Sequence, residues 1–467
     1  MELVPHRRQF VISRSRVDLG EDWTCLELPD GFVLSHQQDL RVTRRPDGGL
    51  VLGTALPGAS TADVTGLAGR FATVSWPWVG TDASALLSVY HASGPDGPLV
   101  SSSPALLGRL LPAPGAPGPD RRMWWGGMNW FPGPGSPLPQ VRKLLPGQRL
   151  RLPDLTVEDS RGPMASLGPD EQARSVLADE LTATVRAASE GAATTCVALT
   201  AGLDSRTVLA AVLAAGMRVE TVTQVVRNPA DVRVAADISR YLGVRHHVVE
   251  PSPHQEDRVR AWREHTLHAY DDADNRLLLP RDQYRFFHRG TVLLRGNAFE
   301  FGRRFLAPRF RGLDPDDLTG TALWRRFEGS APPHAPSVAA LDEWVATRRH
   351  RRDGLDLVDG FYDDHRLGGW LASLEHGLEL LPGVSVVPAN SARAKAALLA
   401  PTHEERTAGT VQRDVVHDLA PELERFPVNP PPTGVRRHVR TVRVRAGRAT
   451  RALRQLAGGR GPGTAPR

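Results

Sequence analysis

The chain has 467 residues, of which 40% are hydrophobic and 24% charged, and its formal net charge at pH 7 is +6. This length suits two or three domains with large cores, and the sequence has no run of about 18 apolar residues that could span a membrane as a helix. Two cysteines, Cys25 and Cys196, are too few for a disulfide framework or a cysteine zinc site. The first residues lack the apolar core of a secretory signal, so we expect a cytoplasmic protein.

The first 160 residues alternate short apolar runs with clusters of glycine and proline, which is typical of a mainly β domain. Turn sequences stand at 46–49 (Pro-Asp-Gly-Gly) and 94–97 (Gly-Pro-Asp-Gly). The predicted strands are 10–12, 31–34, 50–53, 69–74 and 86–90.

A strand, a short loop and a helix follow one another between residues 194 and 216. The run 194–198 predicts a buried strand, and 207–216 predicts a packed helix that ends at a glycine. Backbone N–H groups at such a helix start attract anions. Because the loop contains an acid, Asp204, and no lysine, we interpret Asp204 as a magnesium ligand beside a di- or triphosphate. The alternative is an ordinary turn in which Asp204 or Ser205 caps the helix.

The alternation of strand and helix continues along the chain. Strands are predicted at 219–226, 244–249 and 291–296, and a helix at 231–242. This order favours a parallel, doubly wound sheet, in which ligands bind beyond the carboxyl ends of the strands. An aspartate at the start of a helix commonly caps it, as we expect for Asp231.

The segment after the strand at 291–296 carries one acid, Glu300, followed by Arg303 and Arg304. A carboxylate with flanking arginines can hold a metal ion and orient pyrophosphate. The alternative is a surface helix with a stabilising glutamate in its first turn.

Two features stand out in the C-terminal part. Tyr362, Arg366 and Trp370 share one face of a helix predicted over 361–370. From residue 436 to the end there are many arginines and no acid, which indicates either an arm for a membrane surface, nucleic acid or acidic partner, or a solvated tail. We favour the solvated tail and do not expect nucleic acid as a partner, because no aromatic residue is interleaved with the arginines.

The loop at 200–205 (Thr-Ala-Gly-Leu-Asp-Ser) resembles the pyrophosphate loop of the asparagine synthetase family, Ser-Gly-Gly-x-Asp-Ser. The segment 296–305 is similar to the second loop of that family, which holds magnesium and the reacting carboxylate. In the N-terminal part, the sequences at 69–71 (Gly-Arg-Phe), 101–103 (Ser-Ser-Ser) and 144–148 (Leu-Leu-Pro-Gly-Gln) resemble its glutaminase half. Since that half needs cysteine as the second residue and this chain has Glu2, the resemblance implies a glutaminase-shaped domain without glutaminase chemistry.

The resemblance also implies a domain organisation. Residues 1–160 would form an α+β glutaminase-like β-sandwich domain. Residues 165–430 would form an α/β doubly wound parallel sheet domain of the ATP-pyrophosphatase, or adenine nucleotide alpha hydrolase-like, kind. Residues 431–467 would form a basic, flexible tail.

The function that the resemblance implies is that of an ATP-dependent carbon–nitrogen ligase. A substrate carboxylate would attack the α-phosphate of ATP, release pyrophosphate, and form an amide with ammonia or an amine, in a specialised-metabolite or asparagine-type pathway. The alternative is a catalytically inactive relative that binds a partner or a carrier. The sequence leaves the oligomeric state open, and a homodimer is compatible with it.

The resemblance assigns roles residue by residue. Asp204 and Glu300 would hold Mg²⁺, and Glu300 would also act in catalysis. The resemblance also offers an alternative for Asp231, since an acid at this place in the family often lies near the nucleotide. Some relatives use a late lysine to stabilise acyl transfer, which points to Lys395, although a solvated helix lysine is the alternative that we favour for it. The residues implied to bind ATP and its pyrophosphate are Leu199, Thr200, Ala201, Gly202, Leu203, Asp204, Ser205, Arg206, Gly296 and Arg303.

Overall fold

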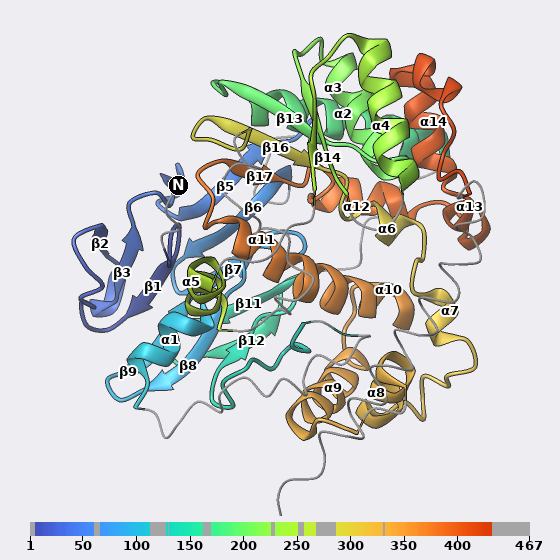
Figure 1. The fold of residues 1–467 in the computed structure, drawn as a ribbon. Helices are drawn as coiled ribbons and strands as arrows, with labels where there is room; N and C mark the ends of the chain where they lie inside the picture. Colours follow the sequence, from blue (N-terminus) through green and yellow to red (C-terminus); the bar gives the residue numbers. More distant parts are fainter. Residues whose placement is uncertain are drawn as a thin grey trace, which may run out of the picture.

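The computed structural model describes residues 5–59, 66–112, 128, 130–161, 170–225, 229–250, 256–267, 286–329 and 332–431 (Figure 1). Residue 2, residues 162–169 at the junction between the two predicted domains, and all but the first residue of the predicted tail lie outside these ranges. Within the described ranges, no helix has the length and apolar character needed to cross a bilayer.

The N-terminal part consists of two antiparallel sheets that share one core. Phe10 and Leu34 from one sheet pack in the same cluster as Leu52 and Val74 from the other, so the two sheets form a sandwich. The strand order is β10-β8-β9-β1-β3-β2 in the first sheet and β12-β11-β7-β6-β5-β4 in the second. The strands are β1 (Phe10–Ser13), β2 (Trp23–Glu27), β3 (Val33–Gln37), β4 (Val42–Arg44), β5 (Leu50–Pro57), β6 (Leu67–Ser75), β7 (Trp78–Thr81), β8 (Tyr90–Gly94), β9 (Gly97–Ser101), β10 (Arg142–Lys143), β11 (Gln148–Arg151) and β12 (Thr156–Asp159).

Four of the five strands predicted in this part are confirmed within a few residues, and the strand predicted at 86–90 is wrong. Only Tyr90 of that run belongs to a strand. The backbone N–H groups of Ser84, Leu86 and Leu87 instead donate to the buried carboxylate of Asp82, at 2.9–3.1 Å. The apolar residues of the run are therefore buried in a loop, because one carboxylate satisfies the backbone groups that a strand would pair.

The second half of the chain contains a five-stranded sheet with the order β15-β14-β13-β16-β17. Every neighbouring pair in it is parallel. The strands are β13 (Thr194–Ala198), β14 (Glu220–Gln224), β15 (His246–Val249), β16 (Thr291–Arg295) and β17 (Val384–Val386). Four of them were predicted, and β17 was missed because a run of three residues carries no periodicity. The order reverses direction between β13 and β16, which makes their carboxyl ends the topological switch point.

Helices cover both faces of this sheet (Figure 1). Val197 and Leu294 pack with Leu209 of α3 (Leu203–Ala214) on one face, whereas Cys196 and Leu293 pack with Trp262 of α5 (Glu256–Thr266) on the other. The sheet is therefore the middle of three layers. The helices that precede or surround it are α1 (Pro104–Leu110), α2 (Asp170–Ser189), α3 (Leu203–Ala214), α4 (Pro229–Leu242), α5 (Glu256–Thr266), α6 (Phe299–Gly302) and α7 (Ala307–Phe310).

The helix predicted over 361–370 is present, but it is wound as a π-helix, η7 (Tyr362–Leu371). Its His365 is fully buried, stacked on Phe361 at 4.4 Å between ring centroids and 5.0 Å from Trp344. Burial lowers the pKa of His365 to about 3, so the ring is neutral near pH 7. The other helices of this part are α8 (Gly320–Glu328), α9 (Ala335–Arg348), α10 (Leu357–Phe361), α11 (Ala372–Leu378), α12 (Ala392–Leu399), α13 (His403–Ala408) and α14 (Thr410–Leu419).

We expect the substitution His365→Phe to make stability less dependent on pH. An unfolded histidine titrates near pH 6.5, whereas the folded group titrates at about 3, so in that window the unfolded chain binds one more proton. As the pH is lowered between these two values, the free energy of unfolding of the wild type should fall by about 1.4 kcal/mol per pH unit. The variant should lack this contribution. Urea unfolding of both proteins at several pH values measures it, and parallel curves would contradict the prediction.

Lys395 is buried between the β-sandwich and helix η7, so its interpretation as a solvated lysine is wrong. Its ammonium forms an ion pair with Asp363 of η7 and donates to the carbonyl of Ala83 at 2.8 Å. Arg161 donates to the other oxygen of Asp363 at 2.7 Å. This charged group joins segments far apart in the chain, which sequence periodicity does not reveal.

The substitution Lys395→Met should destabilise the fold by about 3 kcal/mol, because removing one partner of a buried ion pair leaves an uncompensated charge. Denaturant unfolding measures this cost. The matched control is Arg240→Gln, which removes an exposed ion pair with Asp237 and should cost less than about 1 kcal/mol. Equal costs for the two variants would contradict a structural role for Lys395.

Candidate functional site

The first predicted loop joins β13 to α3 at the switch point of the sheet. Helix α3 begins at Leu203, with Gly202 as its N-cap at φ −75°, so the predicted start at residue 207 is wrong. Asp204 and Ser205 lie in the first turn, where the helix dipole favours negative charge. Ala201 stays outside the left-handed region, so the loop needs no glycine at that position.

Side chains of the loop already satisfy several of its backbone N–H groups. The N–H of Thr200 donates to Ser205 Oγ at 3.1 Å, and the N–H of Gly202 donates to Thr200 Oγ1 at 3.0 Å. The N–H of Ala201 donates to Asp231 Oδ1 at 3.1 Å. Helix α4 begins at Pro229, so Asp231 does not cap its own helix but reaches the loop instead.

The second predicted loop lies directly against the first. Strands β13 and β16 are neighbours, and Ala198 pairs with Arg295 at their carboxyl ends. A Cβ atom on Gly296 would lie 2.7 Å from the backbone C of Asp204 and 2.7 Å from the backbone N of Ser205. The two loops therefore meet backbone to backbone, which only glycine at position 296 permits.

This contact brings Asp204, Glu300 and Arg303 together. Arg303 Nη2 donates to Asp204 Oδ2 at 2.5 Å. Burial raises the pKa of Asp204 to about 6, with Arg303 acting against the shift and the charge of Glu300 adding to it. Asp204 Oδ1 is buried and accepts no hydrogen bond from any described residue. Two carboxylates with a free buried oxygen form a place where a cation is favourable.

Helix α6, which carries Glu300, is flanked by left-handed backbone at non-glycine residues. Ala298 has φ +79° and Arg304 has φ +49°. Such conformations cost free energy and gather at functional sites. Arg304 is fixed by Asp356 at 2.7 Å and Asp359 at 3.0 Å, so these two acids and the nearby His403 hold a guanidinium where a metal ion could otherwise bind.

Two of the three side chains predicted to share a face of the helix at 361–370 lie next to Glu300. Tyr362 donates its hydroxyl hydrogen to Glu300 Oε2 at 2.9 Å, and Arg366 Nη2 lies 3.9 Å from the same oxygen. Arg366 lies over the Trp370 ring, 3.5 Å from its centroid. The sequence grouped these three side chains but did not link them to Glu300, which is on a distant segment.

Two predicted site residues have other contacts. Arg206 is buried and donates to the carbonyls of Leu423, Phe426 and Pro427 at 2.7–3.3 Å, so it holds the last described segment onto α3. Lys395 lies 5.2 Å from the Phe301 ring centroid but pairs with Asp363. Leu199 and Leu203 are buried in the core. The N–H of Leu199 donates to Val222 and its C=O accepts from Thr223 Oγ1, so of the two only Leu203 could meet a ligand, through its backbone.

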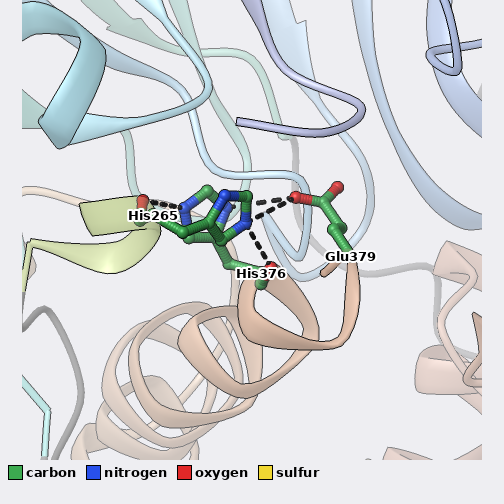
Figure 2. Close-up of side chains that lie close together, drawn as sticks. All are labelled: His265, His376 and Glu379. Atoms are coloured by element: carbon green, nitrogen blue, oxygen red, sulfur yellow. Dashed lines mark hydrogen bonds and ion pairs between the residues drawn. The ribbon is translucent and has the colours of Figure 1, made fainter. Parts of the chain in front are cut away.

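A second group, formed by His265, His376 and Glu379, has no signature in the sequence (Figure 2). The two rings stack 4.2 Å apart, and all three side chains are buried. The backbone N–H of His6 donates to His265 Nδ1 at 2.9 Å, so the ring proton of His265 is assigned to Nε2. That nitrogen donates to the carbonyl of His376 at 2.8 Å, so neither nitrogen of His265 has a lone pair free for a metal ion.

These three side chains instead connect distant parts of the chain. Glu379 pairs with Arg70 of β6, and His376 Nε2 donates to the carbonyl of His265 at 3.0 Å. Burial and the neighbouring His265 lower the pKa of His376 to about 4. The group thus joins α5, α11 and the sandwich through two stacked, buried rings and the ion pair of Glu379 with Arg70.

A cavity of about 270 Å³ lies beside this group and away from Asp204 and Glu300. Residues of β5, β6, α2, α11 and β17 line it, among them Arg70 and Ser385. None of the residues that line this cavity belongs to the two loops.

The substitution Gly296→Ala should separate the two loops. Because the added methyl would clash with backbone atoms, which cannot turn away, we expect a loss of about 1–3 kcal/mol in the free energy of unfolding. The matched control is Gly108→Ala in α1, where the nearest atom is the flexible end of Leu138 at 3.2 Å. A cost at Gly296 no larger than at Gly108 would show that the loops do not need this contact.

A scan against protein-family models and a search of curated proteins find no match to this chain. The resemblance to the asparagine synthetase family therefore stays a prediction from its motifs. The function has to be argued from the residues of the site itself.

Proposed function

We propose that this chain is an ATP-dependent ligase that activates a substrate carboxylate as its adenylate and transfers the acyl group to an amine or to ammonia. The observation that carries the proposal is the meeting of Asp204 and Glu300 at the carboxyl ends of the adjacent parallel strands β13 and β16. Ligands of open parallel sheets bind at this switch point. The matching order of the two motifs in the asparagine synthetase family adds support.

The donor set suits magnesium. Asp204 and Glu300 offer hard carboxylate oxygens, and the buried Oδ1 of Asp204 is free of protein donors in the described residues. Asp204 and Glu300 would hold Mg²⁺, which when bound neutralises charge on the phosphates of ATP. The first turn of α3 has no side-chain cap, so its N–H groups remain available to phosphate oxygens.

The chain's own residues have separate tasks in this proposal. As the carboxylate oxygen bonds to the α-phosphorus, the bond to the bridging oxygen of pyrophosphate breaks, and Arg303 and the α3 N–H groups stabilise the leaving charge. Tyr362 holds Glu300 in place through its 2.9 Å hydrogen bond. The amine nitrogen would then bond to the acyl carbon as AMP leaves, and in this proposal Glu300 would accept the proton that the nitrogen loses.

A second candidate is a binding or scaffold protein without catalysis. The N–H groups of Thr200, Ala201 and Gly202 donate to side chains of the chain itself, so fewer donors remain for phosphate than in an open loop. A protein of this kind need not bind nucleotide. Affinity for Mg²⁺ with ATP therefore separates the two candidates.

The substitution Asp204→Asn should weaken binding of ATP with Mg²⁺ by on the order of 100-fold, because an amide cannot replace a metal-binding carboxylate. Calorimetric titration of the full chain measures the affinity. Pyrophosphate release across a panel of carboxylic acids then tests catalysis.

The control is Asp237→Asn, an exposed acid of α4 that pairs with Arg240 at 2.8 Å. It should leave nucleotide affinity unchanged. Equal affinities of Asp204→Asn and the wild type, or no affinity of the wild type, would reject the ligase and favour the scaffold.

A further inference from the structure

We propose that Arg303 is a displaceable cation, which neutralises Asp204 while no metal is bound and is released to the pyrophosphate when a divalent cation takes its place. The inference rests on the proposed function, since it concerns the same metal and the same phosphates. It goes further in coupling the two binding events through one side chain.

The ion pair between Arg303 and Asp204 leaves one atom free on each side. Arg303 reaches Oδ2 through Nη2, while Asp204 Oδ1 and Arg303 Nε are buried and have no hydrogen-bond partner among the described residues. An arginine built to stay with a carboxylate usually donates two parallel hydrogen bonds. Arg303 makes only part of that contact, so its guanidinium is held less firmly than the fold could allow.

The neighbouring arginines of this region are held much more firmly. Arg304 has two carboxylate partners, Asp356 and Asp359, and Arg406 donates to both oxygens of Asp359 at 2.8 and 2.9 Å. Arg303 keeps 27% of its side-chain surface exposed. Arg303 thus makes fewer contacts with carboxylate oxygens than Arg304 or Arg406, and its side chain is freer to rotate.

The side chain of Arg303 is partly exposed and lies beside a glycine. Its Cδ would lie 3.4 Å from a Cβ placed on Gly409, the residue at the start of α14, and glycine has no side chain there. Arg303 itself is the C-cap of the short helix α6, outside regular helical geometry. Rotation of the side chain away from Asp204 therefore requires no change in a long element.

Charge explains why displacement and release are coupled. A divalent cation at the free Oδ1 of Asp204 and the guanidinium at Oδ2 would lie on the same carboxylate and repel each other. The released guanidinium carries donors that match the oxygens of pyrophosphate. Metal binding at Asp204 thus frees the Arg303 guanidinium from its ion pair, so that it can bind the pyrophosphate.

The test measures Mn²⁺ binding to the full chain by electron paramagnetic resonance, first without nucleotide and then with adenylyl imidodiphosphate. Arg303→Gln should bind Mn²⁺ alone about 10-fold more tightly than the wild type, because the competing cation is gone. The same variant should bind the nucleotide with Mn²⁺ more weakly. Arg303→Lys, which keeps the charge, should lie between them.

The matched control is Arg311→Gln, which removes an exposed guanidinium and should change neither affinity. Circular dichroism confirms that each variant is folded. If Arg303→Gln leaves the affinity for Mn²⁺ unchanged while Asp204→Asn abolishes it, the displacement is rejected and the ligase proposal stands. If the wild type binds no Mn²⁺ even with the nucleotide, both are rejected.

Discussion

The candidate site depends on the contact between the backbone of Gly296 and the first turn of α3. A Cβ on Gly296 would lie 2.7 Å from backbone atoms of Asp204 and Ser205, so the two loops can meet only where no side chain separates them. This contact follows from the pairing of β13 with β16. It places Glu300 close enough to raise the pKa of Asp204, and the partial ion pair with Arg303 follows from the same proximity.

Buried charge joins the sandwich to the rest of the molecule. The chain contains two lysines, Lys143 and Lys395, and both are buried, donating to the carbonyls of Gly368 and Ala83. Arg70 and Glu379 form a further buried pair across the same boundary. Since breaking one member of such a pair leaves an unpaired charge inside the protein, these contacts hold the two parts in one arrangement behind the site.

Sequence reasoning succeeded where local pattern is strong and failed where a distant partner decides the structure. The parallel strands of the second half were predicted from apolar runs, but the run at 86–90 became a loop because Asp82 satisfies its backbone. The group of His265, His376 and Glu379 has no signature in the sequence, because tertiary packing brings its members together. Lys395 was expected in solvent, and only its partner Asp363 explains its burial.

The sequence by itself determined the alternation of strand and helix and the two short motifs that follow β13 and β16, because periodicity and loop chemistry are local properties of the chain. Only the tertiary structure decided which strands are neighbours, and therefore that Asp204, Glu300 and Arg303 form one group while Arg206 and Lys395 have partners elsewhere. The physical reason is that charge acts through distance in space. A carboxylate responds to whichever ion the fold brings within a few ångströms, whatever the separation along the chain.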